Sequence, residues 1–87
     1  MSEASLIEYP SDFPIKIMGA AHPEFAQTML AVVLQHAPDF DAASMEMRAS
    51  NGGNYLSLTC TVRATSREQL DNLYRALTGH AMVKMVL

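Results

Sequence analysis

Two alternating segments joined by a double glycine decide the fold, and they lie in MEMRASNGGNYLSLTCTV, residues 45–62. Apolar residues occupy every second position on both sides of Gly52-Gly53, which is the period of a half-buried β-strand. A two-residue turn at these glycines, which tolerate positive φ, would align the two segments as a hairpin over residues 43–64. The expected cross-strand pairs are Ala49 with Leu56, Met47 with Leu58, and Met45 with Cys60. Each apolar residue then faces another apolar residue. A slip by one residue would instead set the apolar side of one strand against the polar side of the other.

A helical pattern lies on each side of this hairpin. Upstream, Pro23 stands where a first helical residue tolerates proline, and apolar residues follow at helical spacing until Pro38 ends the helix. Downstream, Ser66 and Gln69 have the spacing of a capping box at a helix start. The apolar stripe of this second helix is Leu70, Leu73, Tyr74 and Leu77. Gly79 is expected to close the helix in the left-handed conformation.

An outer strand is predicted at each end of the chain. Residues 13–19 alternate, with Phe13, Ile15 and Ile17 inward. Residues 80–87 form the last strand, with Val83, Met85 and Leu87 inward and Met82, Lys84 and Val86 outward. The order is βαββαβ, which predicts an α+β ferredoxin-like sandwich. Right-handed crossovers place both helices on one face of a four-stranded antiparallel sheet of order 4-1-3-2. Residues 13–87 form the single domain, and residues 1–12 are expected to be a flexible lead-in.

Size and composition limit the classes of protein to which this chain can belong. The 87 residues allow one domain with a small core, so a homodimer would supply buried surface that the chain lacks. No apolar run approaches the roughly 20 residues of a membrane helix, and no secretory signal precedes the domain. The single cysteine agrees with a reducing compartment, so we expect a cytoplasmic protein. A net charge of −3 argues against general affinity for nucleic acid.

Several sequence stretches resemble a known family. They are Tyr9-Pro10, FPIKIMG at 13–19, QHAP at 35–38, SNGGNYLS at 50–57 and VKMVL at 83–87. Together they are similar to the YbeD-like family of small bacterial proteins. The resemblance implies a ferredoxin-like fold related to ACT domains, which bind small effectors and often pair across a dimer. It implies no established activity. In ACT domains the turn after the first strand commonly contributes to the effector site, and Gly19 occupies that place here.

The sheet face away from the helices is expected to be basic. Alternation places four of the six basic residues on it, with one acid, Glu46, and therefore a net charge of +3. Two cations and eight acids remain elsewhere, a net charge of −6. Such a face can attract anionic ligands or an acidic protein surface. Met18, Met82, Val86 and Tyr55 share this face or its edges and suggest a contact patch. The candidate binding residues are Lys16, Met18, Gly19, Arg48, Tyr55, Arg63 and Lys84.

Other kinds of chemistry find little support in the sequence. Cys60 points inward, which hides the nucleophile, and no catalytic triad or carboxylate pair meets at one site. His22 and His36 would lie about 21 Å apart along a helix, too far to share a metal ion. We therefore expect no cofactor, no metal and no enzymatic activity of the single chain. An active site completed by another subunit is a third hypothesis, and it requires catalytic groups to meet across an interface.

The sequence thus predicts a regulatory or adaptor domain that binds a protein partner or a small anionic effector. The alternative is an RNA-binding domain that uses the same basic face. RNA-recognition motifs stack bases on aromatic residues of the sheet, however, and the strand at 55–62 offers Tyr55 followed by threonines at the outward positions. Sequence alone leaves open whether the charges on this face serve binding or only solvation.

Overall fold

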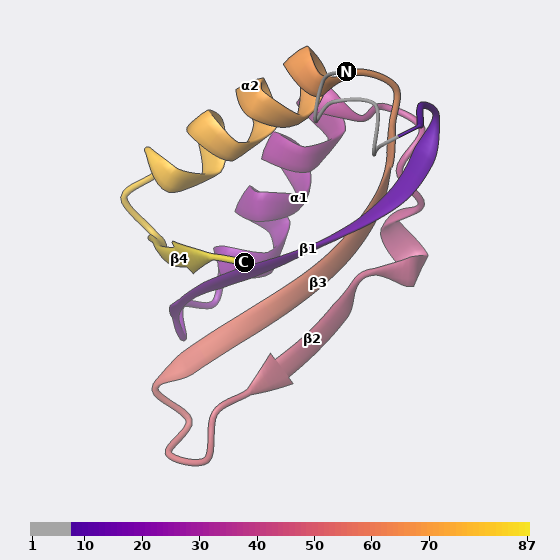
Figure 1. Ribbon diagram of the computed structural model, residues 1–87. Coiled ribbons are helices and arrows are strands. Elements are labelled where there is room, and N and C mark those ends of the chain that lie inside the picture. The colour runs from indigo at the N-terminus through magenta and orange to yellow at the C-terminus, as the bar shows by residue number, and fades with distance from the viewer. Residues whose placement is uncertain (1–7) are drawn as a thin grey trace.

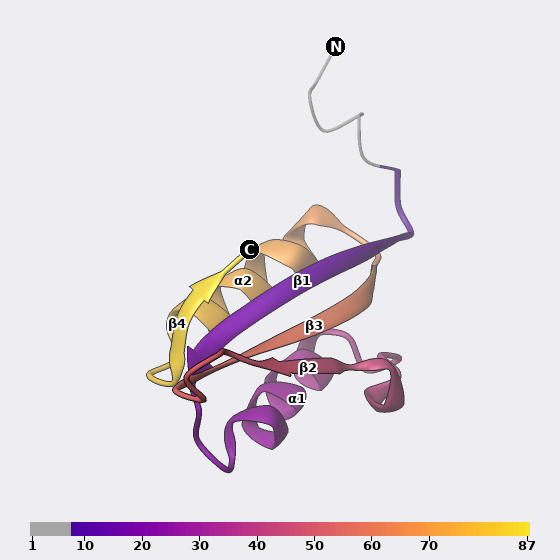
Figure 2. The ribbon, with the colours of Figure 1, turned by 90° about the horizontal axis from the view of Figure 1, so that it is seen from below.

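The computed structural model describes residues 8–87, which form one antiparallel sheet covered on one face by two helices (Figures 1 and 2). The elements are β1 (Ser11–Ala20), α1 (Phe25–His36), η2 (Ala42–Ser44), β2 (Glu46–Ala49), β3 (Tyr55–Ala64), α2 (Arg67–Thr78) and β4 (Val83–Val86). The sheet order β2-β3-β1-β4 confirms the predicted ferredoxin-like topology. Within this range no helix is both long and apolar enough to cross a membrane.

The predicted hairpin register is confirmed, but its turn is not. Ala49 pairs with Leu56 and Met47 with Leu58, as the alternation requires. The predicted two-residue turn at Gly52-Gly53 is wrong, because strand pairing stops before residues 51–54. The Gly53 N–H instead donates to the Ser50 carbonyl at 2.9 Å, and of the two glycines only Gly53 has positive φ, at 74°. A two-residue turn of the favoured type requires positive φ at both central positions.

The strand before this turn is shorter than predicted. Asp41 Oδ1 accepts a 3.0 Å hydrogen bond from the Ala43 N–H and so caps the single 3₁₀ turn of η2. This turn takes residues 42–44 out of the strand, and β2 begins only at Glu46. The expected pair of Met45 with Cys60 is therefore absent from the β2–β3 ladder. Met45 instead packs at the margin of the core.

The core lies between the sheet and the two helices. Ile15 and Ile17 of β1 and Leu58, Cys60 and Val62 of β3 point toward the helices and are fully buried. The helices contribute Phe25, Met29, Val33, Leu70, Leu73 and Leu77. Gly19 belongs to this inner side, and a Cβ at its position would overlap the Phe25 ring and the Met82 carbonyl. A side chain is therefore excluded at residue 19 by packing.

The predicted alternation of the last strand is wrong after its first residue. Ile17 pairs with Val86 and Met18 with Met85, but the register then shifts so that Gly19 pairs with Val83. This β-bulge inserts one residue into β4 and reverses the side-chain alternation. Val86, predicted outward, therefore packs against the core, whereas Met85 and Leu87, predicted inward, are 51% and 62% exposed. Met82, also predicted outward, precedes the strand and packs against the core as well.

The ends of the first strand and first helix differ slightly from the prediction. β1 begins at Ser11, two residues before the expected domain start at Phe13, and residues 1–7 of the expected lead-in lie outside the described residues. The first helix begins at Phe25 rather than Pro23. His22 Nδ1 accepts a 3.0 Å hydrogen bond from the Glu24 N–H just before it. The imidazole thus satisfies one backbone donor at the helix entrance.

The start of the second helix is as predicted, and its end is not. Ser66 Oγ accepts a 3.0 Å hydrogen bond from the Gln69 N–H, which confirms Ser66 as the N-cap. The expected left-handed cap at Gly79 is wrong, because its φ is −84° and its conformation is right-handed. The Gly79 N–H donates to the Arg75 carbonyl at 3.0 Å, so the helical hydrogen bonding continues to this residue.

Candidate functional site

The sheet face away from the helices, here called the open face, is defined by strand register. Directly paired residues of an antiparallel sheet point to the same side, so the partners of Lys16 and Met18 share their orientation. Thr59 and Ser57 of β3 pair with these two residues, and Glu46 and Arg48 of β2 extend the same two rows. Met85 of β4 pairs with Met18, and Leu87 exchanges backbone hydrogen bonds with Lys16 at 2.8 and 3.1 Å. Residues of all four strands therefore meet on this surface.

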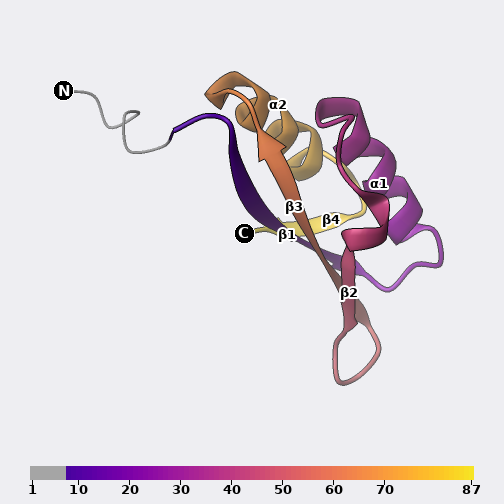
Figure 3. The same cartoon turned by 90° about the vertical axis from the view of Figure 1, so that its right-hand side faces the viewer.

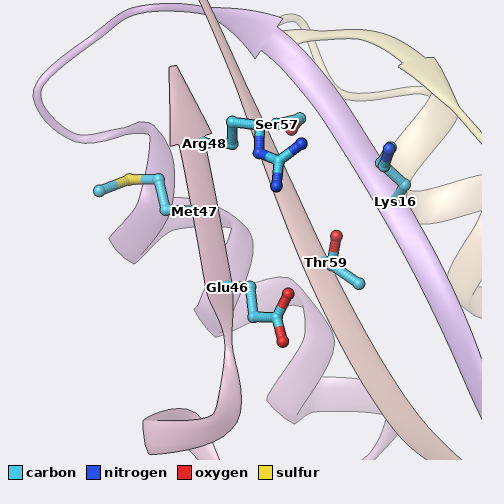
Figure 4. A pocket seen from close by; sticks show the side chains of 6 residues that line it. All are labelled: Lys16, Glu46, Met47, Arg48, Ser57 and Thr59. Atoms are coloured by element: carbon cyan, nitrogen blue, oxygen red, sulfur yellow. The ribbon is translucent and has the colours of Figure 1, made fainter.

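A polar hollow of about 230 Å³ lies on the open face beside β2 (Figure 4). Its lining residues are Lys16, Glu46, Met47, Arg48, Ser57 and Thr59. Arg48 and Glu46 extend from β2 toward β3, Lys16 rises from β1, and the Met47 side chain points away to the outer edge. Lys16 and Arg48 stand on strands separated by β3 and in rows two residues apart, so their positions are about 12 Å apart in the sheet plane at the usual strand spacing and rise. Between them lie the hydroxyls of Ser57 and Thr59.

A second, more apolar hollow of about 130 Å³ adjoins the first and shares Arg48 and Ser57 with it. It is lined by Met18, Arg48, Ala49, Ser50, Tyr55, Leu56 and Ser57. The exposed side chains of Met85 and Leu87 continue the apolar surface beyond Met18. The open face therefore combines cations with hydroxyl groups at β2 and β3 and an adjoining apolar strip. Thioether side chains suit such a strip because they adapt to partners of different shape.

The predicted site residues are brought together only in part. Lys16, Met18, Arg48 and Tyr55 line one or both hollows. Arg63 lies four residues beyond Thr59 on β3, about 13 Å along the strand. Lys84 is exposed in the bulged strand β4. Gly19 lies on the inner side beneath Phe25 and lines neither hollow.

One charged residue of the open face was missing from the sequence prediction. Asp12 pairs with Arg63 and shares its side of the sheet. It was overlooked because the strand was expected to begin at Phe13 rather than Ser11. With Asp12 as a second acid, the predicted charge of +3 for this set falls to +2. Asp12 and Arg63 are direct cross-strand neighbours of opposite charge. The end of the open face at these two residues is therefore more nearly neutral than the end at the hollow.

The remaining reactive side chains of the described part of the chain serve packing or local structure. Burial raises the pKa of the Cys60 thiol from 9.0 to about 11, so the group is protonated at neutral pH. His36 Nδ1 lies 3.1 Å from the Val32 carbonyl, and His80 Nδ1 accepts from the Met82 N–H at 3.1 Å. Residues 8–87 contain no cluster of three or more histidine, cysteine or acidic side chains with the geometry to hold a metal ion.

Comparison with known proteins gives the family. The sequence model described as "Protein of unknown function (DUF493)" matches residues 4–87. This chain belongs to the DUF493 family. A UPF0250 protein of Bordetella pertussis is 75% identical over 85 residues, which cover 98% of this chain and 93% of that protein. A UPF0250 protein of Nitrosomonas europaea is 60% identical over 87 residues, the whole of both chains. The resemblance to the YbeD-like family of small bacterial proteins is thereby confirmed.

A solved structure shows the same fold without close sequence similarity. The solution structure of protein HP0495 from H. pylori superposes with a TM-score of 0.75 over 93% of this chain and 85% of that one. The two sequences are 11% identical, so the likeness concerns the fold alone. Membership of the DUF493 family and the ferredoxin-like architecture thus agree, and any function has to be argued from the side chains of the open face.

Proposed function

We propose that this member of the DUF493 family is a non-enzymatic adaptor or regulatory domain of the cytoplasm. It binds acidic side chains of a partner protein at the open face. The observation that carries the proposal is the hollow between Lys16 and Arg48, which has two cations at its sides, two hydroxyls between them and one acid, Glu46, in its lining. Charge-assisted hydrogen bonds from lysine and arginine to a carboxylate are the stronger class of hydrogen bond.

The size and surroundings of the hollow favour a protein partner over a free small effector. Pockets that enclose small ligands usually measure about 300–1,000 Å³. The hollow of about 230 Å³ lies below that range and is formed on a sheet surface, so it suits a carboxylate projecting from a larger partner. The neighbouring apolar strip at Met18, Met85 and Leu87 would contact apolar residues of the same partner. A small anionic effector shares the carboxylate chemistry and is the second source to test.

The RNA-binding alternative receives less support from the same surface. Binding of single strands uses several aromatic rings on which successive bases stack. Within residues 8–87, Tyr55 is the one aromatic side chain that the strand register places on the open face. Thr59 and Thr61 occupy positions further along β3 on that face. The hydroxyls there can bind an anion but cannot stack on bases.

Chemical-shift mapping by ¹⁵N NMR tests the proposal with three probes. The first is a peptide of alternating glutamate and leucine, the second is citrate, and the third is a single-stranded RNA oligonucleotide. We expect the peptide to shift the amides of Lys16, Arg48, Ser57 and Thr59, and the matched glutamine–leucine peptide to leave them in place. Binding of citrate with equal affinity would favour the effector instead. Binding of RNA alone, or of no probe at these residues, would overturn the proposal.

A further inference from the structure

The outer edge of β2 carries backbone groups that point away from the sheet. The Ser50 N–H donates to the Tyr55 carbonyl at 2.9 Å, and this bond sets the phase of the hairpin ladder. Hydrogen-bonded and non-hydrogen-bonded pairs alternate in antiparallel sheets. The register therefore makes Arg48–Ser57 and Glu46–Thr59 the bonded pairs. It follows that the N–H and C=O groups of Met47 and Ala49 face outward, where no further strand lies among residues 8–87 (Figure 3).

The two edges of the sheet differ in their openness to another strand. At the β4 edge, the register shift between Met18 and Gly19 forms a bulge, a feature that natural sheets use to block edge pairing. β2 pairs with β3 without any such shift, and all four of its residues are exposed. The Met47 side chain, 61% exposed, points to the outer edge (Figure 4). β2 is therefore the edge that can accept another strand.

We propose that two copies of this chain associate through β2, as antiparallel strands related by a twofold axis at Met47. In this register the Met47 N–H of each copy donates to the Met47 carbonyl of the other. The two Met47 side chains meet across the axis and shield each other from water. A contact in which the same patch serves both copies is closed, so it gives a dimer rather than a fibre. The proposal does not rest on anion binding by the open face.

The charges of β2 select this register over its neighbours. With Met47 opposite Met47, Glu46 of each copy lies opposite Arg48 of the other, and both side chains are on the open face. A twofold axis at Arg48 would set two arginines against each other, and an axis at Glu46 would oppose two glutamates. Opposite charges on facing strand positions stabilise a sheet, and like charges destabilise it. The alternation Glu-Met-Arg is thus self-complementary only about its central residue.

The pairing would also change the polar hollow. The twofold axis at Met47 runs perpendicular to the sheet, so the rotation does not turn the sheet over. The helices of both copies therefore lie on the same side of the joined sheet. The two open faces then join into one eight-stranded surface with the two hollows on either side of the axis. Arg48 of the second copy approaches Glu46, which is the one acid that lines the hollow. By the same symmetry, Glu46 of the second copy approaches Arg48, so the pairing adds one cation and one acid beside each hollow and leaves its net charge unchanged. With so short a strand, the dimer is expected to form and dissociate with concentration.

Sedimentation equilibrium of the full chain at low salt, over a concentration series, tests this pairing. Glu46→Arg and Arg48→Glu each place like charges opposite each other at both symmetric positions, and each should raise the dimer dissociation constant by about tenfold or more. The double variant Glu46→Arg/Arg48→Glu should restore wild-type association. So should an equimolar mixture of the two single variants, because each then meets its opposite charge. Asp71→Arg on α2 is the matched control and should associate as the wild type does.

A backbone variant tests the same contact without a change of charge. Met47→Pro removes the N–H that faces the second copy but no ladder hydrogen bond to β3, so the fold should persist while the dimer is lost. Amide spectra of each variant verify the fold. A wild-type chain that stays monomeric at millimolar concentration would overturn the proposal. So would single charge reversals that associate normally, or a mixture of the two single variants that shows no recovery.

Discussion

The side chain of Gln69 joins the start of α2 to the end of α1 through the His36 carbonyl. Gln69 Nε2 donates to this oxygen at 2.9 Å, and Oε1 accepts from the Thr65 N–H at 2.6 Å. The same residue also supplies the N–H that Ser66 caps. One glutamine therefore satisfies backbone groups at two helix ends, 33 residues apart in sequence. The relative placement of the two helices depends in part on this contact.

Replacement of Gln69 by alanine should destabilise the fold by about 2 kcal/mol, because it leaves the His36 carbonyl and the Thr65 N–H without their partner. Urea denaturation followed by circular dichroism measures the change. Glu68→Ala, one residue earlier and exposed, is the matched control and should stay within about 0.5 kcal/mol. Equal effects of the two substitutions would show that the Gln69 contact contributes nothing.

Gly19→Ala should destabilise the protein by about 3 kcal/mol, because the new methyl group would overlap the Phe25 ring and the backbone carbonyl of Met82. A backbone oxygen cannot move aside as a flexible side chain can. Gly52→Ala is the control, since its Cβ would lie 3.3 Å from the mobile side-chain amide of Asn54. Thermal unfolding compares the two variants. A melting temperature for Gly19→Ala equal to that of Gly52→Ala would contradict the packing described here.

Cys60 makes stability fall at high pH. Its pKa is raised from 9.0 to about 11 by burial, so between these values the unfolded chain loses the thiol proton while the folded chain keeps it. The unfolded state gains stability from that ionisation. The contribution of Cys60 to the free energy of unfolding is fully present below about pH 9. It should decline by roughly 2 kcal/mol as the pH rises through 11.

Urea denaturation at several pH values between 8 and 10.5 measures this decline for the wild type and for Cys60→Ala. The alanine variant is less stable at pH 8 because it leaves a cavity in the core. Its stability should then fall less steeply with pH, so the two curves converge. Parallel curves would mean that the buried thiol does not control the pH response.

The hairpin shows what alternation can predict and where it stops. Met47, Ala49, Leu56 and Leu58 predicted the register, because a slip by one residue would have set the apolar side of one strand against the polar side of the other. The turn itself could not be predicted in the same way. The Ser50 hydroxyl accepts from the Tyr55 N–H at 3.1 Å and closes the wider loop, and side-chain bonds of this kind leave no periodic signal.

Alternation along single strands likewise predicted some residues of the candidate site and missed others. Lys16, Arg48 and Tyr55 were placed on the open face by period-two counting along regular strands, and the structure places them there. Met85 and Leu87 were missed, because the bulge opposite Met18 and Gly19 reverses the alternation and largely apolar sequence on both sides of β4 gave no sign of it. Lys16 and Arg48 are separated by β3, so only the tertiary register could show that they border one hollow.

The affinity of the acidic glutamate–leucine peptide, measured by isothermal titration calorimetry at low salt, tests the central claim most directly. Lys16→Glu/Arg48→Glu should abolish binding, whereas Arg67→Glu/Arg75→Glu, an equal change of charge on exposed positions of α2, should weaken it only slightly. Equal losses in both double variants would mean that net charge alone attracts the peptide. Unchanged binding by Lys16→Glu/Arg48→Glu would contradict an anion-binding site on the open face.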